Sequence, residues 1–381
     1  MFQIFNRKMK YKFALIIFLL VTTISCYSQI EAVRGVWLTN VDSDVLTSKE
    51  KIVDAVKFLD EIGLNTIFVV VWNKGMTQYK SKIMKEFTGL ELDTLLKDFD
   101  PLPVLIEEAH KRNMKVIAWF EFGFSSSYKQ NGGKILELKP HWKAIDVNGN
   151  LVSKNGFEWM NGFHPEVQDF IISLIKEVIT NYKVDGIQGD DRLPAMPVES
   201  GYDDYTINLY RSEHNGKNPP EDFRDSQWVN WRAGKLNQFM KRIYKEVKSI
   251  NPGLIVSMAP SIYPWSKEEY LQDWPEWLKT KNVDLICPQL YRYNIKDYEK
   301  LLVDIVENQI DKEDLKKFYP GILLKVGSYY ASPELIKNKI ELNRRYGING
   351  EVFFFYEGLK KYPDLFKELY KERAKFPELV N

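Results

Sequence analysis

The chain has 381 residues, of which 44% are hydrophobic and 28% are charged, a composition that excludes both a disordered chain and a multi-span membrane protein. Its 53 Lys and Arg residues almost balance its 52 Asp and Glu residues, so the formal net charge is +1. Because proteins that find nucleic acid through bulk charge need a basic surface, we expect no nucleic-acid partner.

The N-terminus predicts an export signal over residues 1–28. Basic residues precede an apolar run at 13–21, which is too short to span a bilayer and is followed by small polar residues. Simple secretion with cleavage before Gln29 is the favoured interpretation. The alternative is a lipoprotein signal, because Ile24-Ser25-Cys26 resembles a lipobox, with Cys26 as the lipid anchor. Either route predicts a periplasmic, cell-surface or extracellular protein that meets a membrane only through that anchor.

The cysteines and histidines predict no metal site. Without the signal, Cys287 is the one remaining cysteine, so no internal disulfide is expected; it lies in an apolar run typical of a core. The four histidines lack metal-ligand spacing, and they are His110, His141, His164 and His214. We therefore predict no metal, no cofactor and no nucleophilic thiol.

Apolar runs alternate with amphipathic segments along the rest of the chain. Strands are expected at 34–40, 65–72, 115–122, 184–190, 254–260, 283–290, 319–326 and 351–356. Helices are expected at 51–62, 102–112, 165–182, 227–250, 267–279, 295–309, 333–346 and 362–375. Near-continuous apolar runs are typical of parallel strands buried on both faces. Eight strands that alternate with eight helices predict an α/β fold of the (β/α)8 type, a TIM barrel.

A doubly wound open sheet is the alternative fold. It would need a Gly-rich phosphate-binding turn after the first strand, where this chain has Asn40-Val41-Asp42-Ser43. We therefore predict one barrel domain over residues 31–381. Its longest loops follow strands two, three and four, at 73–100, 123–164 and 191–226. Loops of this length are usually functional, so we expect them to form a wall over the barrel mouth.

Carboxylates are expected at the strand ends, where TIM barrels carry their chemistry. Asp190 ends the apolar fourth strand, and its burial would require either a task or a partner such as Arg192. Glu121 ends the third strand and is open to three roles: catalytic acid, ligand of a sugar hydroxyl, or ion-pair partner. Glu357 ends the eighth strand, where it either touches substrate or caps the next helix. Asp185 opens the fourth strand at the opposite face and is predicted to be structural.

Aromatic and amide side chains are expected at the same level as these carboxylates. Flat ring faces beside carboxylates and amides match the C–H faces and hydroxyl edges of a sugar. Because single tryptophans on strands are commonly core residues, only the whole pattern points to a carbohydrate. Its members are Trp37, Trp72, Asn73, Trp119, Gln289, Tyr291, Tyr329 and Tyr356.

Motifs spread over residues 31–360 resemble the glycoside hydrolase-like family 10, a family of exported bacterial barrels. They are Arg34-Gly35-Val36-Trp37, Ala118-Trp119-Phe120-Glu121-Phe122-Gly123, His164-Pro165-Glu166-Val167, Asp185-Gly186-Ile187-Gln188-Gly189-Asp190-Asp191, Trp231-Arg232, Gln272-Asp273-Trp274 and Pro288-Gln289-Leu290-Tyr291. Their order and spacing are together more specific than any one motif. The chain departs from the family at Tyr79-Lys80-Ser81, where members often read Tyr-Pro-Ser.

The resemblance implies a carbohydrate-active barrel enzyme, and some family members resemble hydrolases of peptidoglycan glycan strands. It places Asp190 at the nucleophile position of α-amylase-like barrels and adds His164 to the expected substrate contacts. A chitinase-type pattern would instead need a general-acid Glu at position 192, where this chain has Arg192. That difference counts against substrate-assisted catalysis.

We therefore predict a glycosidase that cleaves O-glycosidic bonds of a polysaccharide, with peptidoglycan as a candidate substrate. Such enzymes generally use two carboxyl groups. Asp190 is predicted as nucleophile or base and Glu121 as acid, with Asp191 and Glu357 as the next candidates. The ring of Trp119 beside Glu121 predicts a raised pKa for the acid. Two alternatives stay open: a non-catalytic glycan-binding barrel, and a transglycosylase that uses the same site.

Overall fold

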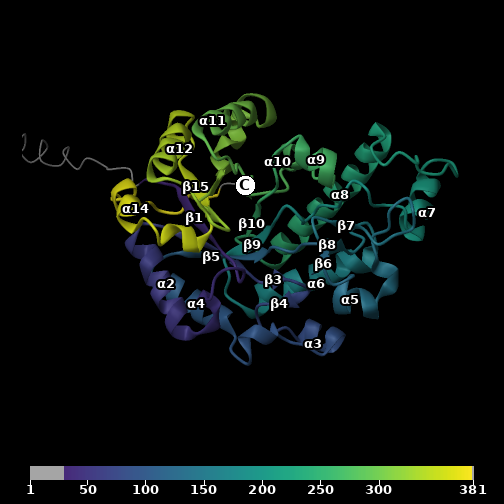
Figure 1. Cartoon of the computed structure of the whole chain (residues 1–381), viewed down its shortest axis with the longest axis horizontal. Coiled ribbons are helices and arrows are strands. Elements are labelled where there is room, and N and C mark those ends of the chain that lie inside the picture. Colours follow the sequence, from purple (N-terminus) through teal and green to yellow (C-terminus); the bar gives the residue numbers. More distant parts are fainter. Residues whose placement is uncertain (1–29, 380–381) are drawn as a thin grey trace, which may run out of the picture. The chain divides into compact units, whose positions relative to one another are not determined.

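A computed structural model describes residues 30–379 (Figure 1). The predicted export signal at 1–28, with Cys26, lies outside the described residues. Within 30–379, no helix is both long enough and apolar enough to cross a membrane.

Eight parallel strands form the central sheet. They are β1 (Val33–Leu38), β2 (Thr66–Val70), β5 (Lys115–Phe120), β9 (Gly186–Gly189), β10 (Ile255–Met258), β11 (Leu285–Ile286), β12 (Gly321–Leu323) and β15 (Gly350–Phe354). Each strand pairs with the next, β15 pairs with β1, and parallel bridges Ile286–Phe318 and Gln289–Gly321 join the β11 and β12 segments. The sheet therefore curls round on itself, which confirms the predicted α/β barrel architecture.

Helices surround this sheet, as Figure 1 shows. The helices that alternate with the strands are α2 (Lys49–Glu61), α4 (Pro101–His110), α6 (Pro165–Asn181), α8 (Ser226–Ile250), α9 (Trp265–Tyr270), α10 (Trp274–Lys279), α11 (Ile295–Asp304), α12 (Pro333–Arg345) and α14 (Pro363–Leu369). The segment expected as one helix at 267–279 is two, because Leu271 ends α9 with a left-handed backbone (φ 55°). Side chains cap several starts; for example, Asp225 accepts from the first two amides of α8 beyond Ser226.

The three long loops at the barrel mouth contain secondary structure of their own. Their elements are β3 (Trp72–Asn73), β4 (Met76–Thr77), α3 (Lys82–Thr88), β6 (Ser125–Tyr128), α5 (Gly133–Leu138), β7 (Ser153–Lys154), β8 (Phe157–Trp159) and α7 (Asp204–Glu213). The later loops add the hairpin β13 (Lys325–Val326) and β14 (Tyr329–Tyr330) and the short helix α13 (Tyr356–Leu359). Backbone pairing within these loops explains how such long segments hold a defined wall.

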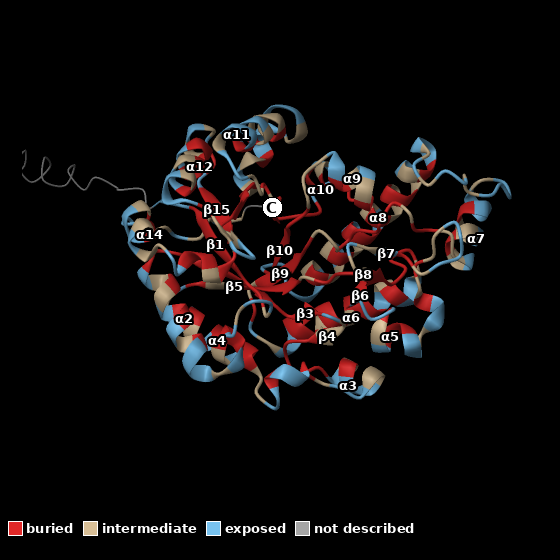
Figure 2. Ribbon diagram, in the orientation of Figure 1, coloured by how far each residue is buried: buried red, intermediate tan, exposed pale blue. Residues whose placement is uncertain are grey.

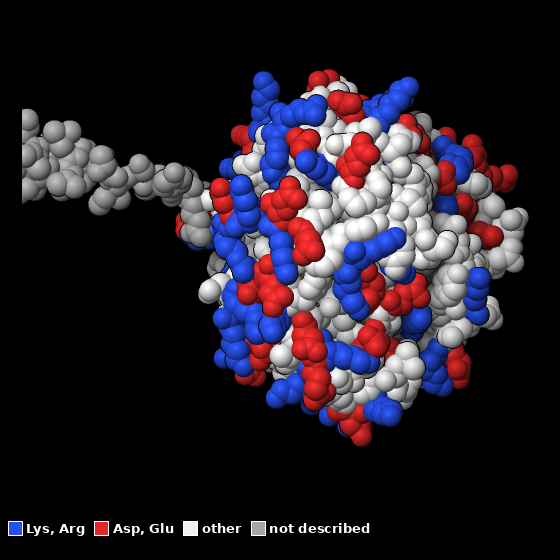
Figure 3. Space-filling model, turned by 60° about the vertical axis from the view of Figure 1, so that its left-hand side comes forward, with Lys and Arg blue, Asp and Glu red and all other residues white. Residues whose placement is uncertain are grey.

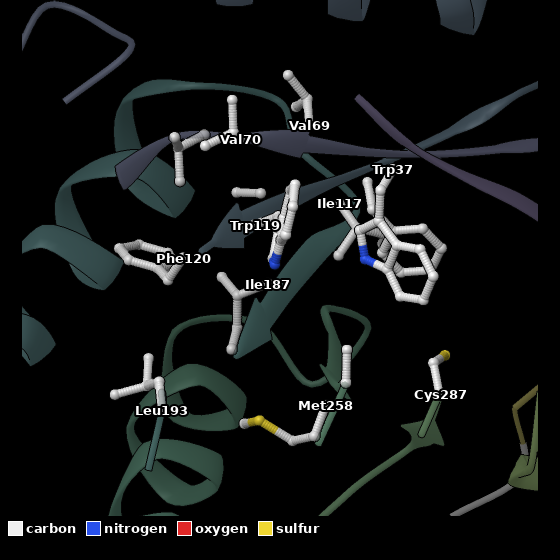
Figure 4. Packing of buried hydrophobic residues seen from close by; sticks show 14 of the residues in the cluster. Trp37, Val69, Val70, Ile117, Trp119, Phe120, Ile187, Leu193, Met258 and Cys287 are labelled. Atoms are coloured by element: carbon white, nitrogen blue, oxygen red, sulfur yellow. The ribbon is translucent and has the colours of Figure 1, made fainter. Parts of the chain in front are cut away.

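Aromatic side chains fill the barrel interior, where burial is continuous through the central strands (Figure 2). The ring of Trp37 lies 6.0 Å from that of Phe68, 6.3 Å from that of Trp119 and 6.2 Å from that of Phe354. Figure 4 shows Trp37 and Trp119 side by side in this packing. These residues come from four strands, so the interior is a packed core on which the mouth of the barrel rests.

Cys287 belongs to this core, as its apolar neighbourhood predicts (Figure 4). Burial raises the pKa of its thiol to about 12, so the reactive thiolate is not formed near neutral pH. On the surface, Lys and Arg are interspersed with Asp and Glu on the face shown in Figure 3.

Candidate active site

Glu121 and Asp190 lie next to each other at the ends of two neighbouring barrel strands. The strands β5 and β9 pair in parallel register up to Phe120, which stands opposite Gly189. The next residue on each strand is a carboxylate. Because side chains alternate along a strand, Glu121 points to the same side as Trp119, towards the barrel axis. The register thus brings both carboxyl groups to the mouth at one level.

Asp190 is held by N–H donors from three directions. Its Oδ2 lies 3.1 Å from Nε1 of Trp119, and its Oδ1 lies 2.6 Å from Nε2 of Gln289 and 2.7 Å from the backbone nitrogen of Asp191. The guanidinium of Arg192 is 3.7 Å from Oδ2. Asp190 is only 3% exposed, so this donor set fixes the carboxylate in one orientation.

Burial raises the pKa of Asp190 well above 3.8. The carboxylates of Asp191 and Glu121 raise the Asp190 pKa further, while Arg192 and the Asp191 amide lower it. Burial also raises the pKa of Glu121, with Arg192 as the main opposing charge. Like charges that face each other in a buried site titrate as a coupled group, so one of these carboxyls holds a proton at higher pH than an isolated carboxyl would.

Only one oxygen of Glu121 is anchored. Its Oε2 accepts from Nδ2 of Asn73 at 2.6 Å and from Oγ1 of Thr39 at 3.2 Å. Asn73 is fully buried and also donates to Asn40 at 2.9 Å. Within residues 30–379, Oε1 of Glu121 has no hydrogen-bond partner, so this atom is available to a bound molecule.

Asp191 is engaged in an ion pair. Its Oδ1 lies 2.8 Å from Nη1 of Arg192, closer than Asp190 is to the same guanidinium. Nε of Arg192 donates to the carbonyl oxygen of Glu121 at 3.0 Å, and the guanidinium lies 4.6 Å from the ring of Phe157. Arg192 therefore ties β9, β5 and the loop over the mouth together, and it occupies Asp191 more fully than Asp190.

Tyr291 brings a phenol to the cluster. Burial raises its pKa well above 10, and the negative charges of Asp190, Asp191 and Glu121 raise it further. The hydroxyl therefore stays protonated and can donate a hydrogen bond. The Tyr291 ring packs against Phe354 at 5.4 Å, which fixes its position.

Trp37 and Trp72 are both buried. Trp37 is 1% exposed and donates from Nε1 to Gln188 at 2.6 Å. Trp72 is fully buried and donates to the carbonyl of Gly123 at 3.0 Å. Trp37 packs with Trp119 and Phe354 in the barrel interior, whereas Trp72 packs against Phe170 of α6. Both residues, expected as substrate contacts, are therefore core residues. Trp119 is similarly buried and reaches the site through its N–H.

The structure does not bring Glu357 into the cluster. β15 ends at Phe354, and Glu357 lies inside the short helix α13. Its carboxylate accepts from Ser43 at 3.0 Å and pairs with Lys360 at 3.0 Å. These contacts join Glu357 to the loop after β1 and to its own helix, and no side chain caps the start of α13.

Tyr356 and His164 also lie outside the cluster. The ring of Tyr356 packs edge-on against Phe58 of α2 at 6.0 Å. Nδ1 of His164 accepts from the amide of Glu166 at 3.2 Å, which caps the start of α6. The sequence motif at His164 therefore reflects a helix start.

Two further residues support the site: Thr39, which the sequence did not single out, and Arg232, which it named only within the Trp231-Arg232 motif. Thr39, which binds Glu121, stands two residues after Trp37 and shares its inward side by strand alternation. Arg232 is fully buried on α8 and donates to the carbonyls of Val198, Ser200 and Phe223. Burial lowers the pKa of Arg232 to about 9. One side chain thus ties down the loop that follows β9.

The departure from the family within residues 79–81 falls on Lys80, which is exposed and donates from its backbone N–H to Asp100 at 3.2 Å, whereas the two flanking residues hold structural contacts. Tyr79 is fully buried, and its hydroxyl lies 3.2 Å from both the carbonyl of Leu174 and the carboxylate of Glu177. Ser81 caps α3 and binds the same Glu177. Within 30–379, no group of three or more His, Cys, Asp or Glu side chains is arranged to hold a metal ion.

Comparison with known proteins places this barrel in a family. The model described as Glycosyl hydrolase-like 10 matches residues 32–323. The chain belongs to this family. Glycosyl hydrolase DigH of Escherichia coli K12 is 26% identical over 287 residues, which cover 68% of this chain and 62% of DigH. This chain thus spans less than two thirds of the length of DigH.

Other family relatives and solved structures extend this picture. Glycosyl hydrolase YngK of Bacillus subtilis is 24% identical over 400 aligned positions, covering 91% of this chain and 73% of YngK. The glycoside hydrolase domain of PgaB (BpsB) from Bordetella bronchiseptica superposes with a TM-score of 0.68 at 14% identity, covering 90% of this chain and 99% of that domain. Alpha-L-fucosidase isoenzyme 2 from Paenibacillus thiaminolyticus superposes with a TM-score of 0.65 at 18% identity, covering 90% of this chain and 49% of the fucosidase chain. These two structures show that the glycosyl hydrolase-like 10 chain shares its fold with glycoside hydrolases.

Proposed function

We propose that the protein is an exported glycosidase that hydrolyses O-glycosidic bonds of a polysaccharide, and that peptidoglycan glycan strands are its substrate. The observation that carries this proposal is the pair of carboxyl groups, Glu121 and Asp190, at register-matched strand ends. Glycoside hydrolysis generally requires such a pair. Family membership and the shared fold add support, since the matched relatives are named as glycosyl hydrolases.

Asp190 is assigned as the ionised partner. Every group that contacts its carboxylate is an N–H donor, from Trp119, Gln289, Asp191 and Arg192. A protonated Asp190 would need an acceptor for its proton, whereas an anion satisfies all these donors. Asp190 is therefore suited to act as nucleophile at the anomeric carbon or as base towards a water molecule.

Glu121 is assigned as the acid. Burial raises the pKa of both carboxyls, so their surroundings decide which one holds the proton. Asp190 faces N–H donors alone, whereas Oε1 of Glu121 has no hydrogen-bond partner among the described residues and can carry the proton. In the reaction this proton passes to the glycosidic oxygen as its bond to the anomeric carbon breaks. Water then supplies a hydroxyl to the anomeric carbon and a proton that restores the acid, directly or after a glycosyl–Asp190 ester.

The remaining polar groups of the site orient the two carboxylates and offer hydrogen bonds to the substrate. Gln289 also donates to the carbonyl of Ala259 at 3.1 Å, so its amide is oriented before substrate arrives. Asn73 orients Glu121 in the same way. Tyr291 supplies an O–H donor for a substrate oxygen. Such pre-oriented groups lower the reorganisation that the reaction needs.

The test is product formation by the purified protein. We would offer intact peptidoglycan, peptide-free peptidoglycan and a panel of plant and bacterial polysaccharides, with Asp190→Asn as the blank. New reducing ends from one glycan, absent with the variant, support hydrolysis and identify the substrate class. Glycan binding without any product would favour the non-catalytic barrel, and longer products without new reducing ends would favour a transglycosylase.

A further inference from the structure

An exposed tyrosine, Tyr293, and a half-buried one, Tyr329, contact each other at the barrel mouth. Tyr293 follows β11, and Tyr329 lies in the hairpin β13–β14 that follows β12, so both belong to loops at the barrel mouth. Tyr293 is 62% exposed. The two ring centroids are 4.8 Å apart at an interplanar angle of 84°. In this edge-to-face pair, one ring supports the other and leaves ring surface open to solvent.

The tyrosine pair is continuous with the proposed active site. Tyr293 is two residues beyond Tyr291, and the negative charge of Asp190 raises the pKa of the Tyr291 phenol. The strand segments that carry the two tyrosines are neighbours, because Gln289 bridges in parallel to Gly321. A chain of sugars bound at Asp190 can therefore extend over Tyr291 towards Tyr293 and Tyr329.

The loop that presents Tyr293 is fixed from below by a buried lysine. Lys339 of α12 has no exposed surface, and its Nζ donates to the carbonyl of Arg292 at 2.7 Å. Nη1 of Arg292 in turn donates to the carbonyl of Tyr291 at 3.0 Å. Burying an ammonium group is unfavourable, and here its one backbone acceptor lies in this loop. The outcome is an exposed ring on a rigid support, which reduces the ordering entropy of binding.

We infer that Tyr293 and Tyr329 form a sugar-binding subsite that holds the substrate at one or more units from the cleaved bond. This inference rests on the proposed glycosidase function and names part of its substrate contact. The C–H face of a sugar ring stacks on the open ring surface of Tyr293. The ring of Tyr329 packs edge-on against the Tyr293 ring and supports it. The subsite favours chains long enough to reach from Asp190 to the pair.

Binding to the inactive Asp190→Asn protein tests the subsite without turnover. The probes are peptide-free peptidoglycan oligosaccharides of two, four and six sugars, or the matching series of the glycan that the panel identifies. Adding Tyr293→Ala should weaken binding of the longest probe about tenfold, the effect of one lost aromatic contact, and leave the shortest unchanged. Tyr293→Phe should bind like the parent, since the ring face makes the contact.

Tyr346→Ala is the matched control. Tyr346 is a half-buried tyrosine at the end of α12, on the opposite end of the barrel, and its loss should change no affinity. In the active protein, Tyr293→Ala should raise KM for long chains with kcat unchanged, as expected when uniform binding is removed.

The two proposals fail separately. If no glycan yields product with the otherwise wild-type protein, the glycosidase proposal fails, and the binding series still decides the subsite. The subsite is overturned if Tyr293→Ala binds the longest probe as tightly as the parent, if Tyr346→Ala weakens it equally, or if the parent binds none of the probes.

Discussion

Glu121 and Asp190 follow directly after Phe120 and Gly189, which are opposite each other in neighbouring parallel strands. The distance along the chain between them is large, yet strand register makes them neighbours at the mouth. Burial raises the pKa of both, and the charge of Glu121 raises the pKa of Asp190 further. This one relationship supplies the acid and the anion that the proposed reaction needs, and the predictions below address its parts.

Glu121→Gln should separate protonation of the leaving group from the rest of catalysis. The variant should lose most activity on polysaccharide, by about 100-fold or more, because general acid catalysis contributes 10²–10⁴-fold. It should retain activity on an aryl glycoside of the same sugar, whose leaving group needs no proton. Initial rates on both substrates decide this, and equal losses on the two would show that Glu121 is not the acid.

The pH profile of the wild-type protein should carry the signature of Glu121. Because burial raises its folded pKa, the acid keeps its proton above the usual range, and activity falls as pH rises through that folded value. Glu121→Gln cannot deprotonate, so its residual activity should lack this alkaline limb. Measuring kcat/KM from pH 4 to pH 9 for both proteins tests the assignment.

Asp190→Asn should change how stability depends on pH. Since the folded pKa of Asp190 lies above 3.8, stability from this group is fully present at low pH and is lost as pH rises from 3.8 through the folded pKa. Asparagine does not ionise, so Tm of the variant minus Tm of the wild type should increase from pH 4 to pH 8. Lost hydrogen bonds set the offset between the curves but not this trend. A difference that decreases with pH would contradict the burial argument.

Gln289→Leu should lower activity more than stability. The substitution keeps the approximate volume but removes one N–H donor from the Asp190 anion. A hydrogen bond to a charged group is worth about 1.5–3 kcal/mol, so kcat/KM should fall about 10- to 100-fold. Gln309→Leu, at an amide that contacts Tyr263 and Asp304 instead, is the control and should leave kcat/KM unchanged. Similar activity in the two variants would remove Gln289 from the site.

Arg232→Met should destabilise the loop after β9. It leaves two buried carbonyls and one part-buried carbonyl without their donor, and each unsatisfied buried group costs about 1–3 kcal/mol. Urea unfolding should show a loss of about 3 kcal/mol or more, and limited proteolysis should cut first within residues 191–225. Lys241→Met on the exposed side of the same helix should do neither.

The barrel was predictable because its strands are buried on both faces and therefore read as apolar runs. The strand-end residues that the structure brings together, Glu121, Asp190, Asn73, Gln289 and Tyr291, were named from the sequence for the same reason: a barrel collects its strand ends at one mouth. Strand register determines which of these residues become neighbours, such as Glu121 and Asp190, and a local sequence pattern does not contain this information.

The features that the sequence did not predict depend on the direction in which a side chain points from its strand or helix. Trp37 and Trp72 share the strand-end level in sequence but face the core. His164 stands before an apolar helix, and its helix-cap geometry is a matter of backbone angles. Tyr293 lies two residues beyond a predicted contact, and only the exposed fraction of its ring distinguishes it from a core tyrosine.

The most direct test of the central claim compares the two aspartates at opposite ends of β9. Asp185 pairs with His110 at 2.9 Å and Lys115 at 2.8 Å, away from the mouth. Reducing-end release from peptide-free peptidoglycan should be lost in Asp190→Asn with its circular dichroism unchanged. Asp185→Asn should remain active below its lowered Tm. Undiminished release by a folded Asp190→Asn protein would contradict the account.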